Sequence, residues 1–425
     1  MSLFKKALIL GSSSTAQEEA VVDEEGNLYY DAQEASLHPD ASPDGGILCT
    51  DTEVMDRQRS AVIDIMKSLG RKLLSGKFDL LNISLPVKIF EPRSYLQKLC
   101  DPLVFPYIME KAAAAKEPEE RLKWVVTFFI AGYHRAFLTW SKPFNPILGE
   151  TWHGHLSDGT QAFMEQISHH PPISAFQIVG PGRRYYFHGH SKPTVTHKTN
   201  AITSYAVGER QVEFLDGTCI EVSFPEYNIR NIMSSSTTRA DVSGKVEFVD
   251  RQNGLMANIQ LGKVDGETGL LGRPDAVYGH LYRISIHPVH SRVSLQASDS
   301  WRSQSLRPRI SHIKMKPSSS MNAFVLGSSN DRTESMHTGG DMHIPIATCS
   351  GNWLAYLDWD DERYWTLSEA TPDKWQTEEH VLPSDCSLRD DLNFLAQGDF
   401  ALSQEAKDRM ENDQRRDAKN RPVPT

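Results

Sequence analysis

From Thr151 onward, the sequence is a succession of short β-rich or alternating segments separated by turn signals. Examples are "QAFMEQI", "ERQVEFLDGTCIEVSF" and "LMANIQLGK", and the dipeptides Asp158-Gly159, Asp216-Gly217 and Asn253-Gly254 lie in or between segments of this kind. Asp-Gly and Asn-Gly pairs favour the tight turns of β-hairpins, and many strands at hairpin spacing form a large antiparallel sheet or barrel. The pattern therefore predicts a mainly β fold built on one such sheet.

Helices are expected on both sides of this β-rich region. Before it, an extended stretch is interrupted by Pro86 and Pro92 and is followed by helical segments that run through Trp140. After it, residues 388–419 have a helical composition. Residues 302–342 contain many turn-forming residues and predict a mobile insertion. The chain is therefore predicted to be α+β and mainly β, with flanking helices around the sheet.

The N-terminal residues 1–56 are predicted to form a disordered acidic tail. No Lys or Arg occurs between Lys6 and Arg57, whereas Asp and Glu recur, and the segment shows no sustained hydrophobic period. The tail contributes to the formal net charge of -10, which argues against a nucleic-acid partner. The folded domain is predicted over residues 57–419.

An amphipathic helix is predicted to follow the tail, over residues 57–76. Its apolar residues recur at helical spacing, with Lys and Arg among them. Two interpretations stay open: a helix packed on the domain, and a helix that contacts a membrane surface. The apolar positions are Val62, Ile65, Met66, Leu69 and Leu73.

Three features of the sequence bear on its cellular location: the length of its apolar runs, its N-terminal residues and the spacing of its cysteines. The longest apolar runs, such as Trp124–Tyr133, are far shorter than the roughly 18 to 20 residues that span a bilayer. No convincing signal-peptide cleavage site follows the apolar N-terminal residues. The five cysteines are odd in number and far apart, which fits reduced thiols. We therefore expect a cytosolic protein.

Signatures of common enzyme classes are missing from the sequence. There is no H-E-x-x-H and no G-x-S-x-G, and "GRKLLSGKF" departs from the phosphate-binding loop because Phe78 stands where Ser or Thr would bind magnesium. Adjacent histidines in an extended segment point to opposite faces, so His169 and His170 are not expected to share a metal ion. We therefore expect no catalytic residues, no metal and no cofactor.

The stretch "EQISHHPPISAF" contains the adjacent residues His169 and His170. Pro171 biases His170 to extended geometry, and Pro172 stiffens the exit from the segment, so the two rings are held in position. Near an anion the pKa of a histidine rises from about 6.5, and each cationic ring then offers two N–H donors. The pair suits a phosphate group, while two structural histidines at a strand end are the simpler interpretation of this motif alone.

Two further segments carry cations that a phosphate would need. In "SKPFNPILGETW", Lys142 and Asn145 lie in a proline-rich turn. In the C-terminal helical segment, Lys407, Glu411 and Arg415 are spaced four residues apart on one helix face, where the carboxylate can align its cationic neighbours. A solvated salt-bridge face is the alternative interpretation of that spacing. If the fold brings these segments together, they would clamp a phosphorylated head group.

These motifs together resemble the oxysterol-binding protein family and its related lipid-transfer proteins. The string "EQISHHPP" matches the family signature E-Q-[VI]-S-H-H-P-P, and "SKPFNPILGETW" accompanies it. The resemblance extends from about residue 57 to about residue 419 through "LNISLPVKIFEPRSYLQ", "CSGNWLAYLD" and "QGDFALSQEAKDRMENDQR". It covers nearly all of the chain outside the acidic tail.

The resemblance implies a curved antiparallel sheet that forms an incomplete barrel around an apolar lipid tunnel, closed by an N-terminal lid over residues 57–76. It also implies that phosphatidylinositol 4-phosphate binds with its acyl chains in the tunnel and its head group at the mouth. A second lipid, a sterol or phosphatidylserine, would compete for the tunnel and be exchanged between membranes. The implied head-group residues are Lys142, Asn145, His169, His170, Lys407, Glu411 and Arg415.

Two other functions stay open beside lipid exchange. A sensor or scaffold would hold a sterol or phosphoinositide in the same pocket without net transport. A phosphoinositide or ester hydrolase would use His169 and His170, but the sequence shows no nucleophile or metal ligands for it.

The acidic tail contains a candidate docking motif. The stretch "DEEGNLYYDAQEAS" resembles the motif of two aromatics followed by Asp-Ala-x-Glu that binds VAMP-associated proteins of the endoplasmic reticulum. An extended peptide of this kind buries an aromatic ring and steers its acidic residues to a basic groove. The resemblance therefore implies peripheral attachment to membranes at endoplasmic reticulum contact sites. The matching residues are Tyr29, Tyr30, Asp31, Ala32 and Glu34, and Leu28 replaces the usual first Glu.

Overall fold

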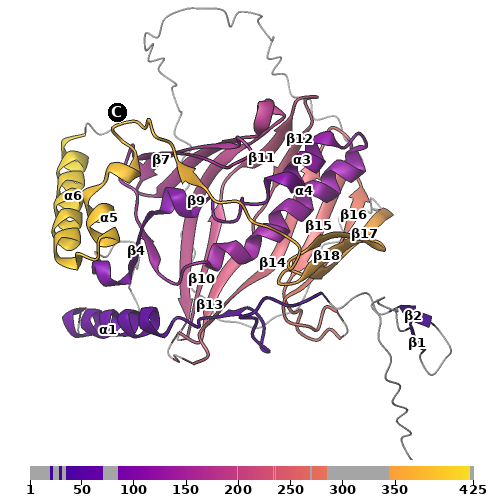
Figure 1. The fold of residues 1–425 in the computed structure, drawn as a ribbon, viewed down its shortest axis with the longest axis horizontal. Coiled ribbons are helices and arrows are strands. Elements are labelled where there is room, and N and C mark those ends of the chain that lie inside the picture. The colour runs from indigo at the N-terminus through magenta and orange to yellow at the C-terminus, as the bar shows by residue number, and fades with distance from the viewer. Residues whose placement is uncertain are drawn as a thin grey trace, which may run out of the picture. The chain divides into compact units, whose positions relative to one another are not determined.

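The central element of the fold is one antiparallel sheet of 16 strands (Figure 1). The computed structural model of the chain describes residues 20–22, 28–30, 35–69, 85–198, 200–232, 234, 236–268, 270–284 and 344–421. Within these residues the strands follow the order β19-β18-β17-β16-β15-β14-β12-β11-β9-β8-β7-β6-β20, so most neighbours in the sheet are also consecutive in the chain. Over the described ranges the two outermost strands, β19 and β20, do not pair with each other, so the barrel stays open. The predicted large, incomplete antiparallel barrel is therefore confirmed.

The strands of this sheet differ widely in length, and the longest ones lie near its middle. Four shorter strands form two separate pairs: β1 (Ala20–Val22) with β2 (Leu28–Tyr30), and β4 (Phe90–Ser94) with β5 (Lys142–Phe144). The strands of the large sheet are β3 (Ile47–Leu48), β6 (Thr151–His155), β7 (Gln161–His169), β8 (Pro172–Val179), β9 (Tyr185–Lys198), β10 (Ala201–Val207), β11 (Arg210–Phe214), β12 (Cys219–Val222), β13 (Glu226–Arg230), β14 (Arg239–Asp250), β15 (Leu255–Leu261), β16 (Ala276–Arg283), β17 (Ile344–Asn352), β18 (Tyr356–Trp359), β19 (Glu362–Thr366) and β20 (Gln376–Thr377).

The predicted turn dipeptides lie between strands that pair with each other. Gly159, Gly217 and Gly254 connect β6 to β7, β11 to β12 and β14 to β15, and their φ angles are 90°, 86° and 63°. A positive φ costs glycine little because it has no Cβ atom. The hairpins predicted at these three places are therefore confirmed.

The two longest strands, β9 and β14, each change partner along their length. β9 pairs with β11 through residues 185–189 and with β10 through residues 192–198, and β14 pairs first with β13 and then with β12. At the change in β9, Gly189 has a φ of 152°, and a Cβ atom there would lie 2.1 Å from the carbonyl oxygen of Glu209. Glycine therefore allows the close backbone approach at the point where β9 changes partner.

Helices α3 (Pro106–Ala114) and α4 (Pro118–Gly132) cover one face of the sheet (Figure 1). Each has a proline in its first turn, where an N–H group would have no partner within the helix. The ring of Phe129 in α4 lies 5.1 Å from that of Phe187 in β9 and 5.8 Å from that of Phe248 in β14, measured between centroids. The face that carries Phe187 and Phe248 is therefore the apolar inner face of the sheet, and the opposite face is its outer face.

The remaining helices flank the sheet, and two of them, α5 and α6, occupy the C-terminal segment that the sequence predicts to be helical. No helix in the described ranges is long and apolar enough to cross a membrane. The remaining α-helices are α1 (Thr52–Leu69), α2 (Tyr95–Lys98), α5 (Asp390–Ala396) and α6 (Phe400–Asn420), and the 3-10 helices are η3 (Val87–Ile89), η4 (Tyr133–Phe137), η5 (Pro181–Arg183) and η6 (Cys386–Leu388).

Residues 35–56 contradict the prediction that all of residues 1–56 are disordered. Ile47–Leu48 forms β3 and pairs with β14, and Ile47 is 5% exposed. The N–H of Gly46 donates to both carboxylate oxygens of Asp275, at 2.8 and 2.9 Å, and its φ is 79°. The acidic composition conceals this contact because the contact depends on a glycine and a short apolar pair. The backbones of β1 and β2 also pair with each other, and the other residues before residue 35 lie outside the described ones.

The predicted lid helix begins earlier than its amphipathic pattern indicates. Helix α1 starts at Thr52 rather than at residue 57, because the Asp51 carboxylate accepts the N–H of Val54 at 2.9 Å and caps the helix. The positions Val62, Ile65, Met66 and Leu69 lie on this helix, which is described there by its backbone. Leu73, with the rest of residues 70–84, and the predicted insertion 302–342 lie outside the described residues.

Candidate functional site

Two lysines from segments that are far apart in the sequence lie near the ring of Phe90. The Nζ atom of Lys142, in β5, lies 4.9 Å from the ring centroid, and the Nζ atom of Lys407, in α6, lies 5.8 Å from it. Glu411 of α6 interacts electrostatically with both Lys142 and His169. The structure thus brings together the turn, the histidine pair and the helix that the sequence singled out. The cationic cluster consists of Lys142, Asn145, His169, His170, Lys407, Glu411 and Arg415.

Lys142 and Asn145 are held together by the proline-rich turn. The Lys142 ammonium donates to the side-chain oxygen of Asn145 at 2.6 Å and to the carbonyl oxygen of Pro143 at 3.2 Å. β5 pairs in parallel with β4, and Lys142 is the register partner of Phe90. The strand pair therefore fixes the stem of Lys142 over the ring, while the turn fixes the amide beside its ammonium.

A buried ion network, which the sequence analysis did not identify, supports this turn. Arg389 donates to the carbonyl oxygen of Asn145 at 3.1 Å and forms ion pairs with Glu150 at 2.7 Å and with Asp391 at 2.6 Å. Glu150 also accepts the N–H of Ile147 at 2.9 Å. All three charged side chains are buried. No spacing in the sequence relates residue 150 to residue 389, so pattern reasoning had no signal for this network.

The histidine pair lies where β7 ends. His169 is the last residue of the strand, His170 lies in the following turn, and the peptide bond between His170 and Pro171 is cis. The two imidazole centroids are 4.6 Å apart, with 72° between the ring planes. The expectation that these neighbours point to opposite faces is therefore wrong, because strand geometry stops at His169. Burial, and then the neighbouring His170, lowers the pKa of His169, while Glu411 acts in the opposite direction.

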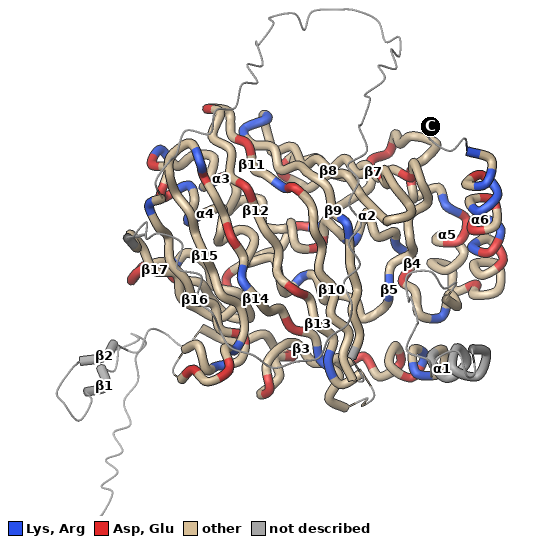
Figure 2. The backbone as a smooth tube through the Cα atoms, turned by 180° about the vertical axis from the view of Figure 1, so that it is seen from behind, with Lys and Arg blue, Asp and Glu red and all other residues tan. Residues whose placement is uncertain are grey.

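In α6 one carboxylate joins two cations on successive turns. Glu411 pairs with Lys407 at 2.5 Å and with Arg415 at 2.8 Å, as the spacing predicts. Lys407 is only 5% exposed, whereas the side chain of Arg415 is 58% exposed. Figure 2 shows basic and acidic residues alternating along the helix. A solvated salt-bridge face therefore describes Arg415 but not Lys407.

The two lysines of the cationic cluster oppose each other electrostatically. Burial, and then the neighbouring Lys407, lowers the pKa of Lys142 to about 8, and Glu411 acts in the opposite direction. Within the cluster this one carboxylate faces Lys142, Lys407 and Arg415, so positive charge is in excess even when both histidines are neutral. An anion bound here would relieve the repulsion and raise the pKa of Lys142.

The donors of the cationic cluster suit a phosphate monoester. Ammonium, imidazole and amide N–H groups converge in it, and charge-assisted hydrogen bonds to phosphate oxygens are short and strong. In the part of the chain that the structure describes, no group of three His, Cys, Asp or Glu side chains lies close enough to hold a metal ion. The arrangement supports noncovalent binding of a phosphorylated molecule.

A cavity of about 580 Å³ adjoins the cationic cluster. Phe90 borders both, and Ser141, next to Lys142 in the chain, also lines the cavity. Helix α1 contributes Val54 and Arg57, so the first turns of the predicted lid helix form part of the wall. The other large apolar residues of the wall are Ile47, Phe137, Leu138, Trp140, Leu395 and Phe400.

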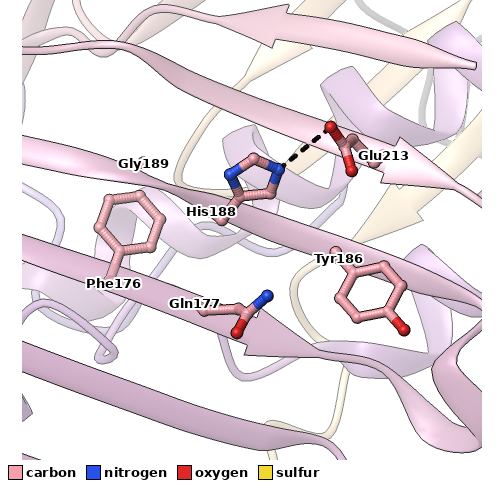
Figure 3. A pocket seen from close by; sticks show the side chains of 6 residues that line it. All are labelled: Phe176, Gln177, Tyr186, His188, Gly189 and Glu213. Atoms are coloured by element: carbon pink, nitrogen blue, oxygen red, sulfur yellow. Dashed lines mark ion pairs between the residues drawn. The ribbon is translucent and has the colours of Figure 1, made fainter. Parts of the chain in front are cut away.

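A second cavity, of about 510 Å³, opens on the outer face of the sheet (Figure 3). His188 and Glu213 form an ion pair there at 3.4 Å. They alternate along their strands with the buried residues Phe187 and Val212, so their side chains belong to the outer face. This cavity contains no residue of the cationic cluster, and the Glu213 carboxylate lines it. It therefore offers no excess charge to an anion.

Comparison of the sequence with known proteins gives one consistent family. A family model described as Oxysterol-binding protein matches residues 71–424. Oxysterol-binding protein 9 of Dictyostelium discoideum is 28% identical over 385 residues, which cover 89% of this chain and 79% of that protein. The mammalian oxysterol-binding protein-related proteins that match are longer, and the matched regions span between 18% and 38% of their length.

Comparison with solved structures identifies ORD domains that have a similar fold. The Osh1 ORD domain in complex with ergosterol superposes with a TM-score of 0.57 at 18% identity, covering 92% of this chain and 86% of that chain. The Osh3 ORD in complex with PI(4)P, from Saccharomyces cerevisiae, has a TM-score of 0.57 at 18% identity and covers 92% of this chain and 90% of that chain. At this identity the similarity establishes a shared fold.

Proposed function

Because this chain belongs to the oxysterol-binding protein family, we propose that it is a lipid carrier whose cationic cluster binds the head group of phosphatidylinositol 4-phosphate. The observation that carries the proposal is the convergence of Lys142, Lys407 and His169 around one carboxylate, Glu411. The Osh3 ORD, which shares the fold, has been solved in complex with PI(4)P, and this supports the choice of lipid.

Each residue of the cluster has a distinct part in the proposed binding. Lys142 and Lys407 supply ammonium groups that their mutual repulsion makes available to an anion. Asn145 offers its amide and His170 a ring nitrogen, and a bound phosphate would raise the pKa of His169, which burial lowers in the free protein. Glu411 orients Lys407 and Arg415 rather than contacting the phosphate itself.

The acyl chains are proposed to occupy the apolar interior of the curved sheet. The inner face carries aromatic rings, among them Phe176 and Phe187, whose centroids are 4.9 Å apart. Burial of apolar surface contributes roughly 25 cal/mol per Å², so a long acyl chain supplies most of the affinity and the head-group contacts supply selectivity. The lid helix, whose first turns line the cavity beside Phe90, would close over the bound lipid. No covalent step is involved.

A second lipid is proposed to compete for the same interior. The Osh1 ORD structure with ergosterol supports a sterol, and phosphatidylserine is the other candidate. Two lipids that need one apolar cavity exclude each other, so loading with one releases the other. The protein would thereby exchange lipids between two membranes.

The N-terminal segment is proposed to attach the carrier to the endoplasmic reticulum through VAMP-associated proteins. Tyr29 and Tyr30 lie in β2, where the backbone is extended, while Asp31, Ala32 and Glu34 lie outside the described residues. An extended peptide with an acidic flank suits a basic groove on a partner. Together with the absence of a membrane-spanning helix in the described ranges, this favours peripheral association at membrane contact sites.

The proposal is tested by measuring lipids bound to the purified full chain with native mass spectrometry, before and after addition of phosphatidylinositol 4-phosphate. We expect a sterol or phosphatidylserine to be displaced. His169→Ala combined with His170→Ala is expected to abolish phosphoinositide binding and to spare the second lipid, while His188→Ala, on the outer face, serves as the matched control.

Three results would redirect the proposal. Equal loss of both lipids in the double variant would indicate a folding defect. Displacement without transfer between donor and acceptor liposomes would make the protein a sensor or scaffold. Release of inorganic phosphate from phosphatidylinositol 4-phosphate would contradict the carrier and favour a hydrolase.

A further inference from the structure

One buried arginine of the described chain has no ion-pair partner. Arg121, Arg210 and Arg389 are 7%, 6% and 8% exposed, respectively. Arg121 and Arg389 form ion pairs with carboxylates. Within the described residues Arg210 forms none, and its guanidinium donates to the carbonyl oxygen of Ala206 at 3.1 Å. A buried cation without a counter-charge is costly, so Arg210 is a candidate for pairing with a ligand.

Arg210 points to the inner face of the sheet. It begins β11, and Val212 and Phe214, which share its face, are 0% and 6% exposed. Glu213, on the opposite face, has a side chain that is 47% exposed. The guanidinium carbon of Arg210 lies 4.6 Å from the centroid of Phe224, a ring that packs against the apolar core. The charge is therefore directed toward the interior of the barrel.

Three tyrosines lie near this guanidinium. Tyr95 of α2, Tyr133 of η4 and Tyr227 of β13 all interact electrostatically with Arg210. Tyr133 is 0% exposed, and in the described chain its buried hydroxyl has no hydrogen-bond partner. The ring centroids of Tyr133 and Tyr227 are 6.3 Å apart. One unpaired cation and one unpartnered hydroxyl therefore lie together in the interior.

Tyr95 and Tyr227 are accessible in part, unlike Tyr133. Burial raises the pKa of both hydroxyls. Each nevertheless keeps an intermediate accessible surface. An accessible phenol beside a buried guanidinium offers a hydrogen bond to a polar ligand group.

We propose that Arg210 and the hydroxyls of Tyr95, Tyr133 and Tyr227 form an interior site for the carboxylate of an apolar ligand, such as a long-chain fatty acid, that enters polar end first. A guanidinium matches a carboxylate in bidentate geometry, and phenol hydroxyls complete the donor set. The apolar remainder packs against Phe224 and the other rings of the inner face. This site is separate from the cationic cluster, and the inference rests on the proposed function because it requires the interior to accept a lipid.

The test compares oleate with oleyl alcohol, which have the same chain and differ at the polar end. By isothermal titration calorimetry at neutral pH, the wild-type chain is expected to bind oleate about tenfold more tightly. Arg210→Gln is expected to remove this preference and leave oleyl alcohol binding unchanged. Lys142→Ala, which removes a cation from the cationic cluster, is the matched control and is expected to keep the preference.

Tyr133→Phe keeps the test decisive if Arg210→Gln does not fold. Its hydroxyl has no partner in the described chain, so the substitution is expected to preserve thermal stability while lowering oleate affinity about threefold. Unchanged oleate affinity in this variant would overturn the interior site. Equal wild-type affinity for oleate and oleyl alcohol would overturn it too, as would a preference that Lys142→Ala abolishes and Arg210→Gln retains.

Binding of phosphatidylinositol 4-phosphate, measured on the same preparations, separates this inference from the proposed function. A wild-type chain that binds phosphatidylinositol 4-phosphate but does not prefer oleate contradicts the interior site alone. A wild-type chain that binds neither lipid contradicts the carrier, and the interior site with it.

Discussion

Two charged regions of the molecule share Asn145 but balance their charges differently. Arg389, which donates to the backbone of Asn145, is paired with Glu150 and Asp391. Burial alone would lower the pKa of Arg389, yet the two carboxylates more than offset it and the pKa is raised. Lys142, which donates to the side chain of the same asparagine, has its pKa lowered to about 8 by burial and by Lys407.

The opposite shifts show which charges are structural and which are available to a ligand. A cation with two buried carboxylates has its electrostatic requirements met by the fold. A cation that lies beside another cation lacks a full counter-charge in the fold, and a bound anion supplies one. The Arg389 network therefore holds the turn in place, whereas the cationic cluster, built on that turn, keeps an excess of positive charge that an anion would offset.

The largest expected effect comes from removing the structural cation. Arg389→Met would leave the buried carboxylates Glu150 and Asp391 without their counter-charge. Breaking a buried ion pair on one side costs about 3 to 5 kcal/mol. We expect a loss of this size in the free energy of unfolding, measured by urea denaturation at pH 7. Arg409→Met, whose ion pair with Asp390 is exposed, is the control and should change stability by less than about 1 kcal/mol.

Removing Lys142 should have the opposite result: stability is kept and lipid affinity is lost. Lys142→Met deletes an ammonium whose charge the fold disfavours, so the free energy of unfolding is expected to stay equal or rise. Binding of phosphatidylinositol 4-phosphate is expected to weaken about 10- to 100-fold, because a hydrogen bond to a charged group contributes about 1.5 to 3 kcal/mol. Liposome extraction assays and urea denaturation measure the two quantities. A variant that loses stability while keeping affinity would show that Lys142 belongs to the structural region instead.

The contrast between the two regions also separates what the sequence predicted from what it did not. His169, Lys142 and the spacing from Lys407 to Arg415 are local patterns, and each was visible in a short stretch of sequence. The large sheet was equally predictable, because glycine-containing turns mark its hairpins. The Arg389–Glu150 pair joins residues 239 positions apart, and no local rule encodes such a contact.

Two predictions that the structure contradicts failed for a similar reason, because each relied on a local sequence pattern. The tail from residue 35 onward was predicted to be disordered because it has no Lys or Arg and no hydrophobic period, yet Gly46 and β3 attach it to Asp275 and β14. The opposite orientation expected for His169 and His170 assumed that the strand continues, whereas it ends between them. In both cases tertiary contacts or strand ends overrode a correct local rule.

The pH dependence of binding and of stability should distinguish the two regions next. With a pKa of about 8 in the free protein, Lys142 loses its proton above that pH, while a bound phosphate would retain it. Affinity for phosphatidylinositol 4-phosphate is therefore expected to fall by up to about tenfold per pH unit above pH 8. The lipid phosphate, with a second pKa of about 6, is fully ionised throughout this range. Lys142→Met should remove this contribution to the slope, and an unchanged slope would assign it to another group.

The free energy of unfolding should rise above pH 8, where the affinity for the lipid falls. Because the unfolded chain holds the Lys142 proton up to about pH 10.4, it binds more protons than the folded chain between about pH 8 and that value. The contribution of Lys142 to the free energy of unfolding therefore rises with pH in this window. Comparison with Lys142→Met by urea denaturation at pH 7.5 and pH 9.5 isolates it.

The smallest effect is expected where the cationic cluster meets solvent. Arg415 pairs with Glu411 at 2.8 Å, but its side chain is 58% exposed, so water and salt screen its charge. Arg415→Gln is therefore expected to weaken phosphatidylinositol 4-phosphate binding only about twofold, and less at high salt than at low salt. Lys407→Gln, at the buried end of the same helix face, should weaken binding far more and with less dependence on salt. If Arg415→Gln proved as damaging as Lys407→Gln, water and salt would not screen the charge of Arg415 in the complex, and the bound lipid would shield it from solvent.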